Sequence, residues 1–152
     1  MAIRAGLRPL KPTLLAVSGI VVLWIATVVV ALSVYSSGPA GDVAASETDY
    51  RISMPTKLRA GHHTIALTND GKEGHELLVF RTDLDASDLP VDADGDVVED
   101  APELELVLDS GDALRSGAGQ SLPVTLDPGH YVAACNLPGH YRLGMRLDIT
   151  VT

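Results

Sequence analysis

The feature that most constrains this chain is a long run of uncharged residues near its beginning. Residues 14–34 contain no Asp, Glu, Lys or Arg, and Leu, Val, Ile and Ala predominate among them. As a helix, these 21 residues would span about 31 Å, which is enough to cross the apolar core of a bilayer. The 152-residue chain therefore has room for one folded domain beyond this run.

Basic residues flank the run on one side only. Three of them precede it, and the next Lys or Arg in the sequence is Arg51. The positive-inside rule then places residues 1–13 in the cytoplasm. We predict a transmembrane helix over residues 14–35 that crosses the cytoplasmic membrane once, with the rest of the chain on the extracytoplasmic side.

A cleaved signal peptide is the alternative interpretation of the same run. The apolar region of a signal peptide is normally about 7–15 residues long, so the length favours an anchor. Val43, Ala44 and Ala45 nevertheless offer small residues at which a peptidase could cut, and cleavage stays open. Both interpretations place the remaining residues in an oxidising compartment.

Composition narrows the function of the part beyond the membrane. Residues 36–46 are small and predict a flexible tether, followed by a domain over residues 47–152. The chain has 11 Lys and Arg against 20 Asp and Glu, a net charge of −9, which argues against nucleic-acid binding. Its single Cys excludes an internal disulfide and a Cys-rich metal site. Removal of residues 1–45 is expected to leave a soluble, monomeric domain.

Apolar and polar residues alternate along much of this domain, which predicts short strands. The clearest case is Met145, Leu147, Ile149 and Val151, separated by polar residues. Similar strands are predicted at residues 50–54, 64–68, 76–80, 104–108, 122–126 and 131–135. With turn signals between them, they indicate an all-β sandwich or barrel.

Residues 82–112, the acidic segment, differ in composition from the rest. They contain twelve Asp and Glu and no Lys or Arg. A calcium-binding EF-hand loop would place Pro90 and Ala101 at ligand positions, so that motif is rejected. We expect a solvated loop, whose negative field could also steer a basic partner protein.

The residues that indicate chemistry lie near the end of the chain. Cys135, His140 and Met145 are spaced C-x4-H-x4-M, with the Cys ending one predicted strand and the Met beginning the next. Thiolate and thioether are soft donors, and imidazole binds copper in both oxidation states. His75, at the start of another apolar strand, is the best fourth candidate. Two His, one Cys and a weak axial Met are the ligands of a blue-copper site.

The same residues carry a resemblance to a known family. Residues 130–151 look like the end of a cupredoxin, and the Cys–His–Met spacing is similar to that of rusticyanin and sulfocyanin. Residues 60–80 resemble the amino-terminal ligand region of that family. The resemblance implies a Greek-key β-sandwich, preceded here by the membrane helix, with one type 1 copper ion and one-electron transfer.

Glu76 departs from the pattern of plastocyanin-like members, which often have Asn after the first His ligand. We therefore expect its side chain to point to solvent and not to join the two ligand loops. Its backbone N–H is expected to donate a hydrogen bond to the Cys135 sulfur.

These observations predict an electron carrier, not an enzyme, since no His-x-His pair for a second copper occurs. Its partner would be a redox protein such as a cytochrome or a respiratory oxidase. Docking is expected at the apolar residues around His140, which are Leu137, Pro138, Tyr141 and Leu143. The alternative function is copper handling, as a chaperone, store or sensor.

Overall fold

The computed structural model describes residues 38–152. The predicted cytoplasmic segment, the predicted transmembrane helix and the first residues of the predicted tether lie outside the described residues. Within residues 38–152, no helix is long and apolar enough to span a membrane.

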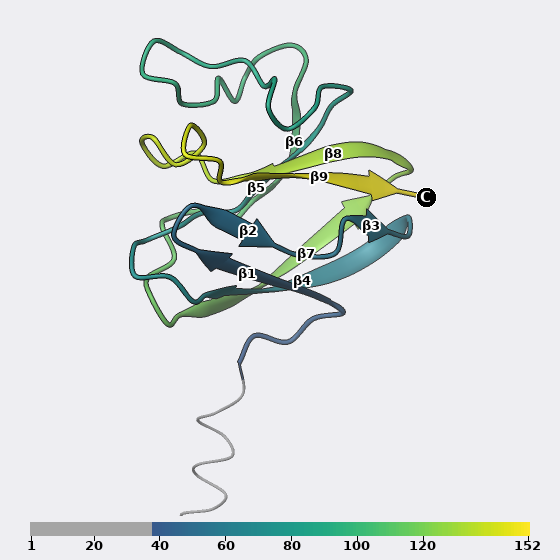
Figure 1. Cartoon of the computed structure of the whole chain (residues 1–152). Coiled ribbons are helices and arrows are strands. Elements are labelled where there is room, and N and C mark those ends of the chain that lie inside the picture. Colours follow the sequence, from purple (N-terminus) through teal and green to yellow (C-terminus); the bar gives the residue numbers. More distant parts are fainter. Residues whose placement is uncertain (1–37) are drawn as a thin grey trace, which may run out of the picture. The chain divides into compact units, whose positions relative to one another are not determined.

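The described residues form two β-sheets that face each other (Figure 1). One sheet has the strand order β2-β1-β4-β7 and the other the order β3-β9-β8-β5-β6. The strands are β1 (Val43–Thr48), β2 (Arg51–Ser53), β3 (Lys57–Leu58), β4 (Gly61–Asn69), β5 (Leu78–Arg81), β6 (Glu105–Asp109), β7 (Gly119–Leu126), β8 (Gly129–Ala134) and β9 (Arg146–Val151). The all-β prediction is confirmed, and each predicted strand overlaps an observed one.

Strand β1 corrects the predicted domain boundary. It pairs with β2 on one side and with β4 on the other, and Val43 and Ala45 are buried in the core. Residues 43–46 are therefore part of the domain and not of a tether. The small side chains hid the alternation of buried and exposed positions. Removal of residues 1–45 would delete half of β1, so the predicted boundary for a soluble fragment is wrong.

The connections differ from those of a simple antiparallel meander. Strands β1 and β4 are parallel, as are β3 and β9. The turn at Asn69, Asp70 and Gly71 joins β4 to β5, which belong to different sheets. The chain therefore crosses the sandwich at this turn. The crossing places His75, four residues after Gly71, at the same end of the molecule as the β8–β9 connection.

Apolar side chains fill two separate regions. The main core lies between the sheets and includes Cys135 and Met145. A second cluster lies on the face of the five-stranded sheet that points away from the main core. It contains Phe80 of β5 and Val132 of β8 together with Leu89 and Val97. The last two belong to the β5–β6 loop, residues 82–104, which covers this face at the top of Figure 1. The expectation of a merely solvated acidic loop is therefore wrong for this part of the acidic segment.

Candidate metal centre

The four predicted ligands come from two connections at one end of the sandwich. Cys135 directly follows β8, Met145 directly precedes β9, and His140 lies on the loop between them. His75 lies before β5 and pairs with Leu114 in an isolated β-bridge. Because β5 pairs with β8, the sequence-distant His75 is brought beside the ligand loop, residues 135–145.

Three of these side chains converge on one point. The ligand atoms of His75, Cys135 and His140 lie within 4.8 Å of one another, and all three residues are buried. The two Nδ1 atoms are 3.3 Å apart, and the Cys135 Sγ is 3.4 Å from the His140 Nδ1. Met145 is fully buried in the core cluster that contains Cys135. This is a compact, water-shielded set of soft and borderline donors, which fits copper.

Main-chain hydrogen bonds close the ligand loop on itself. The Cys135 N–H donates to the Met145 carbonyl and the Met145 N–H to the His140 carbonyl, each at 3.1 Å. Gly139 and Gly144 have φ values of 79° and 100°, a region that favours glycine. Each of them immediately precedes a predicted ligand, so the turns that aim His140 and Met145 depend on them.

The surroundings of Cys135 match the prediction for its sulfur. The Glu76 N–H lies 3.5 Å from the Cys135 Sγ and donates to it. Burial raises the pKa of the Cys135 thiol to about 11, while the N–H groups of Glu76 and Leu137 act in the opposite direction. A metal must therefore displace the thiol proton when it binds.

The prediction for the Glu76 side chain is wrong. Its Oε1 accepts a hydrogen bond of 2.9 Å from the Asn136 N–H, and the side chain is half-buried. Strands β5 and β8 are neighbours, so a glutamate before β5 is long enough to reach the main chain just after β8. Glu76 therefore joins the two ligand-bearing segments, which sequence reasoning had not expected.

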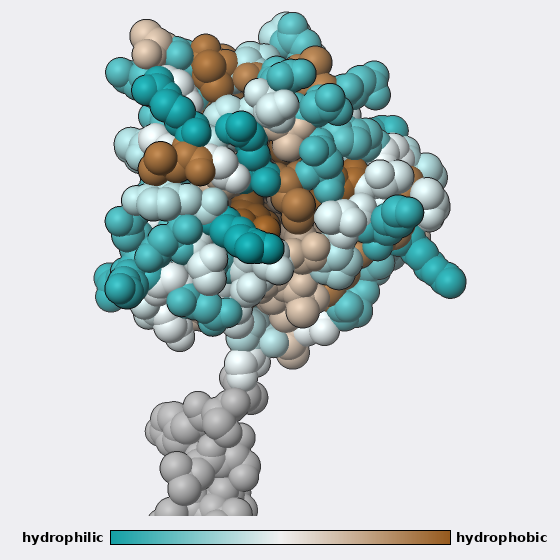
Figure 2. Space-filling view, in the orientation of Figure 1, coloured by the Kyte–Doolittle hydropathy of each residue, from teal (hydrophilic) through white to brown (hydrophobic). Residues whose placement is uncertain are grey.

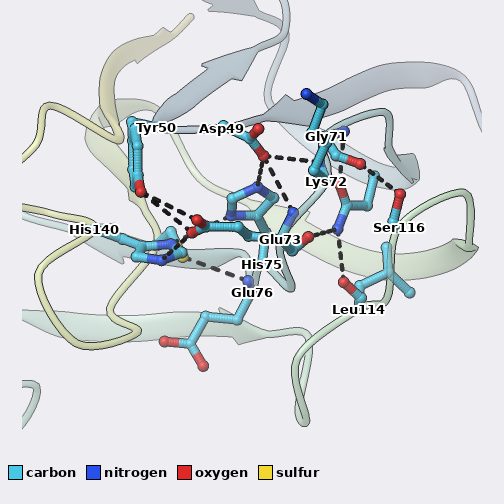
Figure 3. Close-up of polar contacts among 12 residues, drawn as sticks. Asp49, Tyr50, Gly71, Lys72, Glu73, His75, Glu76, Leu114, Ser116 and His140 are labelled. Carbon is cyan, nitrogen blue, oxygen red and sulfur yellow. Dashed lines mark hydrogen bonds and ion pairs between the residues drawn. The ribbon is translucent and has the colours of Figure 1, made fainter.

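Carboxylates contact the outer nitrogens of both imidazoles (Figure 3). Asp49 lies 3.5 Å from the His75 Nε2, and Glu73 lies 3.4 Å from the His140 Nε2. The Tyr50 hydroxyl donates to both Glu73 oxygens at 3.3 Å. Such partners favour a proton on Nε2 and leave Nδ1 free to bind a metal. Sequence reasoning missed Asp49 and Glu73, because no motif links them to the histidines.

Asn69 organises the segment that carries His75. Its side-chain amide donates to the carbonyls of Glu73 and Leu114, each at 2.7 Å, and accepts from the Gly71 N–H at 2.8 Å. The residue is fully buried. In the sequence, Asn69 belongs to an Asn-Asp-Gly run that is typical of turns, and such a run does not by itself mark a residue of a binding site. Its position at the end of a buried strand, six residues before a candidate ligand, is the signal that was available.

Glu47 is the second buried polar residue that sequence reasoning missed. It is fully buried, and neither carboxylate oxygen has a hydrogen-bond partner among the described residues. Burial, and then the charge of Glu76, raises the pKa of Glu47 to about 7. Its charge also raises the pKa of Cys135. A buried carboxyl therefore lies within electrostatic range of the metal centre.

The remaining described histidines make contacts elsewhere. His62 contacts Thr125, and His63 contacts Asp42 and the Arg59 carbonyl. His130 contacts the Thr82 carbonyl and Asp148. Within residues 38–152, the cluster around Cys135 is the one group of His, Cys, Asp or Glu side chains arranged to hold a metal.

A two-sheet β-fold with this donor cluster defines the protein as a cupredoxin. The Sulfocyanin (SoxE) domain model matches residues 24–152. The chain belongs to the sulfocyanin family, and its cofactor is type 1 copper, which the buried donor set fits.

Comparison with solved structures supports the fold. Reduced auracyanin from Roseiflexus castenholzii is 17% identical, with 72% of this chain and 94% of that chain covered and a TM-score of 0.53. Reduced rusticyanin is 20% identical, with 72% and 77% covered and a TM-score of 0.53. Auracyanin A, a blue copper protein from Chloroflexus aurantiacus, is 18% identical, with 72% and 96% covered and a TM-score of 0.52. A comparison with curated protein sequences found no match.

Proposed function

We propose that His75, Cys135, His140 and Met145 bind one type 1 copper ion in an extracytoplasmic protein that transfers single electrons between redox partners. The observation that carries this proposal is the convergence of two imidazoles and one sulfur, whose ligand atoms lie within 4.8 Å of one another in a buried site. The bound ion would supply a one-electron couple between Cu(I) and Cu(II). The chain holds the donors in fixed positions, which the two glycine turns and the Glu76–Asn136 hydrogen bond support.

Electrons are expected to pass through the edge of His140. Its side chain is 11% exposed, whereas that of His75 is fully buried. A partner that docks over His140 therefore comes within contact distance of one ligand without opening the site.

The surface around His140 has an apolar side and an acidic side. Leu143 is 59% exposed, and Pro138 is also exposed. Figure 2 shows apolar surface among polar side chains at the end where Figure 1 draws the ligand loop. The Glu73 carboxylate contacts the His140 Nε2 and contributes negative charge to the acidic side. Such a surface suits short-lived docking of a basic redox protein, for example a cytochrome or a respiratory oxidase.

The structure revises two expectations about this surface. Tyr141 is buried, and its hydroxyl donates to the Ala86 carbonyl, so it does not belong to the exposed apolar rim. Several acids of the β5–β6 loop accept hydrogen bonds, namely Asp92, Asp96 and Glu99. Asp83, Asp85 and Glu103 are exposed and remain available for steering. The association rate with a basic partner should therefore fall as salt rises.

The test of the copper assignment is spectroscopic. Cu(II) added to the full chain should produce an intense thiolate-to-copper absorption band and a type 1 EPR spectrum. Cys135→Ser should abolish the band, while Met145→Leu should keep it and raise the reduction potential. A blue Cys135→Ser protein would contradict the assignment. A colourless wild-type protein that holds only Cu(I) would favour copper handling.

We also propose that residues 14–35 tether the domain to the cytoplasmic membrane, on the basis of their length and flanking charge. The full chain should sediment with membranes, and its domain should be accessible to protease from the extracytoplasmic side. Deletion of residues 1–37 should release it with β1 intact. A deletion that stayed with the membrane would contradict the tether.

A further inference from the structure

The β5–β6 loop is hydrogen-bonded to the ligand loop next to Cys135. The Val97 N–H donates to the Asn136 Oδ1 at 2.5 Å, and the Asn136 Nδ2 donates to the Val97 carbonyl at 3.0 Å. The same Nδ2 donates to the Glu99 Oε1 at 2.8 Å. One side-chain amide thus binds both main-chain groups of a single residue, as a neighbouring strand would. The residue that carries this amide directly follows Cys135.

A second contact lies next to His140. The Gly139 N–H donates to the Asp96 Oδ1 at 2.9 Å. Asp96 is presented by a tight turn in which the Asp92 Oδ1 accepts from the N–H groups of Asp94, Gly95 and Asp96 at 2.9–3.1 Å. This turn uses only the main chain of Asp96, so the Asp96 carboxylate is free to bind the ligand loop.

A third contact lies on the other side of His140. The Tyr141 hydroxyl donates to the Ala86 carbonyl at 2.7 Å and accepts from the Leu89 N–H at 3.1 Å. Its ring packs in the second apolar cluster with Leu89 and Val97. The three contacts therefore involve the residue after Cys135 and the residues on both sides of His140.

We infer that the β5–β6 loop is a clamp that holds the ligand loop in its metal-binding conformation, with Asp96 and Asn136 as positioning residues for His140 and Cys135. The inference rests on the proposed copper site. A loop fixed from outside keeps its donors in place without metal, so little reorganisation is needed when metal binds or changes oxidation state. The acidic composition of the loop is explained in part by this role, because carboxylates accept main-chain N–H groups strongly.

The competing explanation is that the loop only covers an apolar sheet face. The two explanations differ at Asp96, which binds the ligand loop but lies outside the apolar cluster. Asp96→Ala removes the acceptor, whereas Asp96→Asn keeps an oxygen in the same place. Asp100→Ala is the matched control, because it removes one negative charge from an exposed position of the same loop.

The first measurement is amide hydrogen exchange at Gly139 in the metal-free full chain. Asp96→Ala should speed exchange about tenfold, the equivalent of about 1.4 kcal/mol. Asp96→Asn should restore most of the protection, and Asp100→Ala should leave it unchanged. Tyr141→Phe, which keeps the ring in the apolar cluster, should also speed exchange at Gly139. Unchanged exchange in Asp96→Ala, or an equal effect of Asp100→Ala, would overturn the clamp.

The second measurement uses Cu(II)-loaded protein. Asp96→Ala should shift the EPR hyperfine splitting and speed copper release, with Asp96→Asn close to wild type. A spectrum and release rate that do not change in Asp96→Ala would also count against positioning. If wild-type protein gave no type 1 spectrum, the copper assignment would fail, while the exchange measurement would still decide whether the clamp exists.

Discussion

The two segments that carry the predicted ligands are held in different ways. The inner segment, residues 69–76, is fixed by the buried amide of Asn69 and by main-chain pairing of His75 with Leu114. The outer segment is the ligand loop, residues 135–145, which the β5–β6 loop holds from the solvent side. One half of the site is thus part of the core, and the other half depends on a separate loop.

Two glutamates of the inner segment reach across to the outer one. Glu76 accepts from the Asn136 N–H, and Glu73 contacts the His140 imidazole. The inner segment can therefore act as the fixed reference against which the ligand loop is placed. If this view is correct, substitutions in the inner segment should cost more than equivalent ones in the outer loop.

The largest expected effect is that of Asn69→Ala. It removes the three hydrogen bonds that this fully buried side chain makes to main-chain groups; the Leu114 carbonyl keeps its bond from the His75 N–H. At about 1 kcal/mol for each group, the free energy of unfolding should fall by about 3 kcal/mol. Denaturant unfolding of the metal-free protein measures this loss.

The matched control in the outer loop is Asn136→Ala, which also removes three side-chain hydrogen bonds. Asn136 is only half-buried, so water can replace part of what is lost. Its cost should be about 1 kcal/mol. Equal losses for the two variants would show that the inner segment is no firmer than the outer one.

The second effect concerns Glu47, which lies in the core within electrostatic range of Glu76 of the inner segment. Its pKa is raised from 4.5 to about 7 in the folded protein. Between these values the unfolded chain releases a proton that the folded protein keeps, so stability falls as pH rises and levels off above pH 7. The loss should be on the order of 3 kcal/mol.

Glu47→Gln should remove this pH dependence and make the metal-free protein more stable than wild type above pH 7. His63 contributes a pH dependence of stability with the same sign at higher pH. The Arg59 carbonyl and Asp42 raise its pKa, and its stabilising effect is lost as it deprotonates. His63 is present in both proteins, so the difference between them isolates Glu47. Parallel pH profiles for wild type and Glu47→Gln would rule out the assigned role.

The sequence could predict the features that depend on local spacing, but not those that depend on long-range contacts. The spacing of Cys135, His140 and Met145 is local, so the ligand loop could be located from the sequence, and the alternation of apolar residues located the main strands. Asp96, Glu73 and the Glu76 contact could not be found, because they depend on which strands become neighbours. Glu47 was missed for a different reason: the small side chains of β1 hid that strand, and an acid is normally placed on the solvent face.

The smallest expected effect is that of Glu73, the contact between the inner segment and the exposed edge of His140. Its side chain is 51% exposed, so solvent screens its charge and little stability depends on it. A negative charge beside a ligand still favours the more positive oxidation state of a bound metal. Glu73→Gln should therefore raise the reduction potential by less than about 60 mV, a tenfold change for one electron. The shift should shrink as salt rises.

Tyr50→Phe is the control, because it removes the hydroxyl contact with Glu73 and keeps the charge. A potential that did not respond to Glu73→Gln at low salt would mean that the inner segment positions His140 without tuning it.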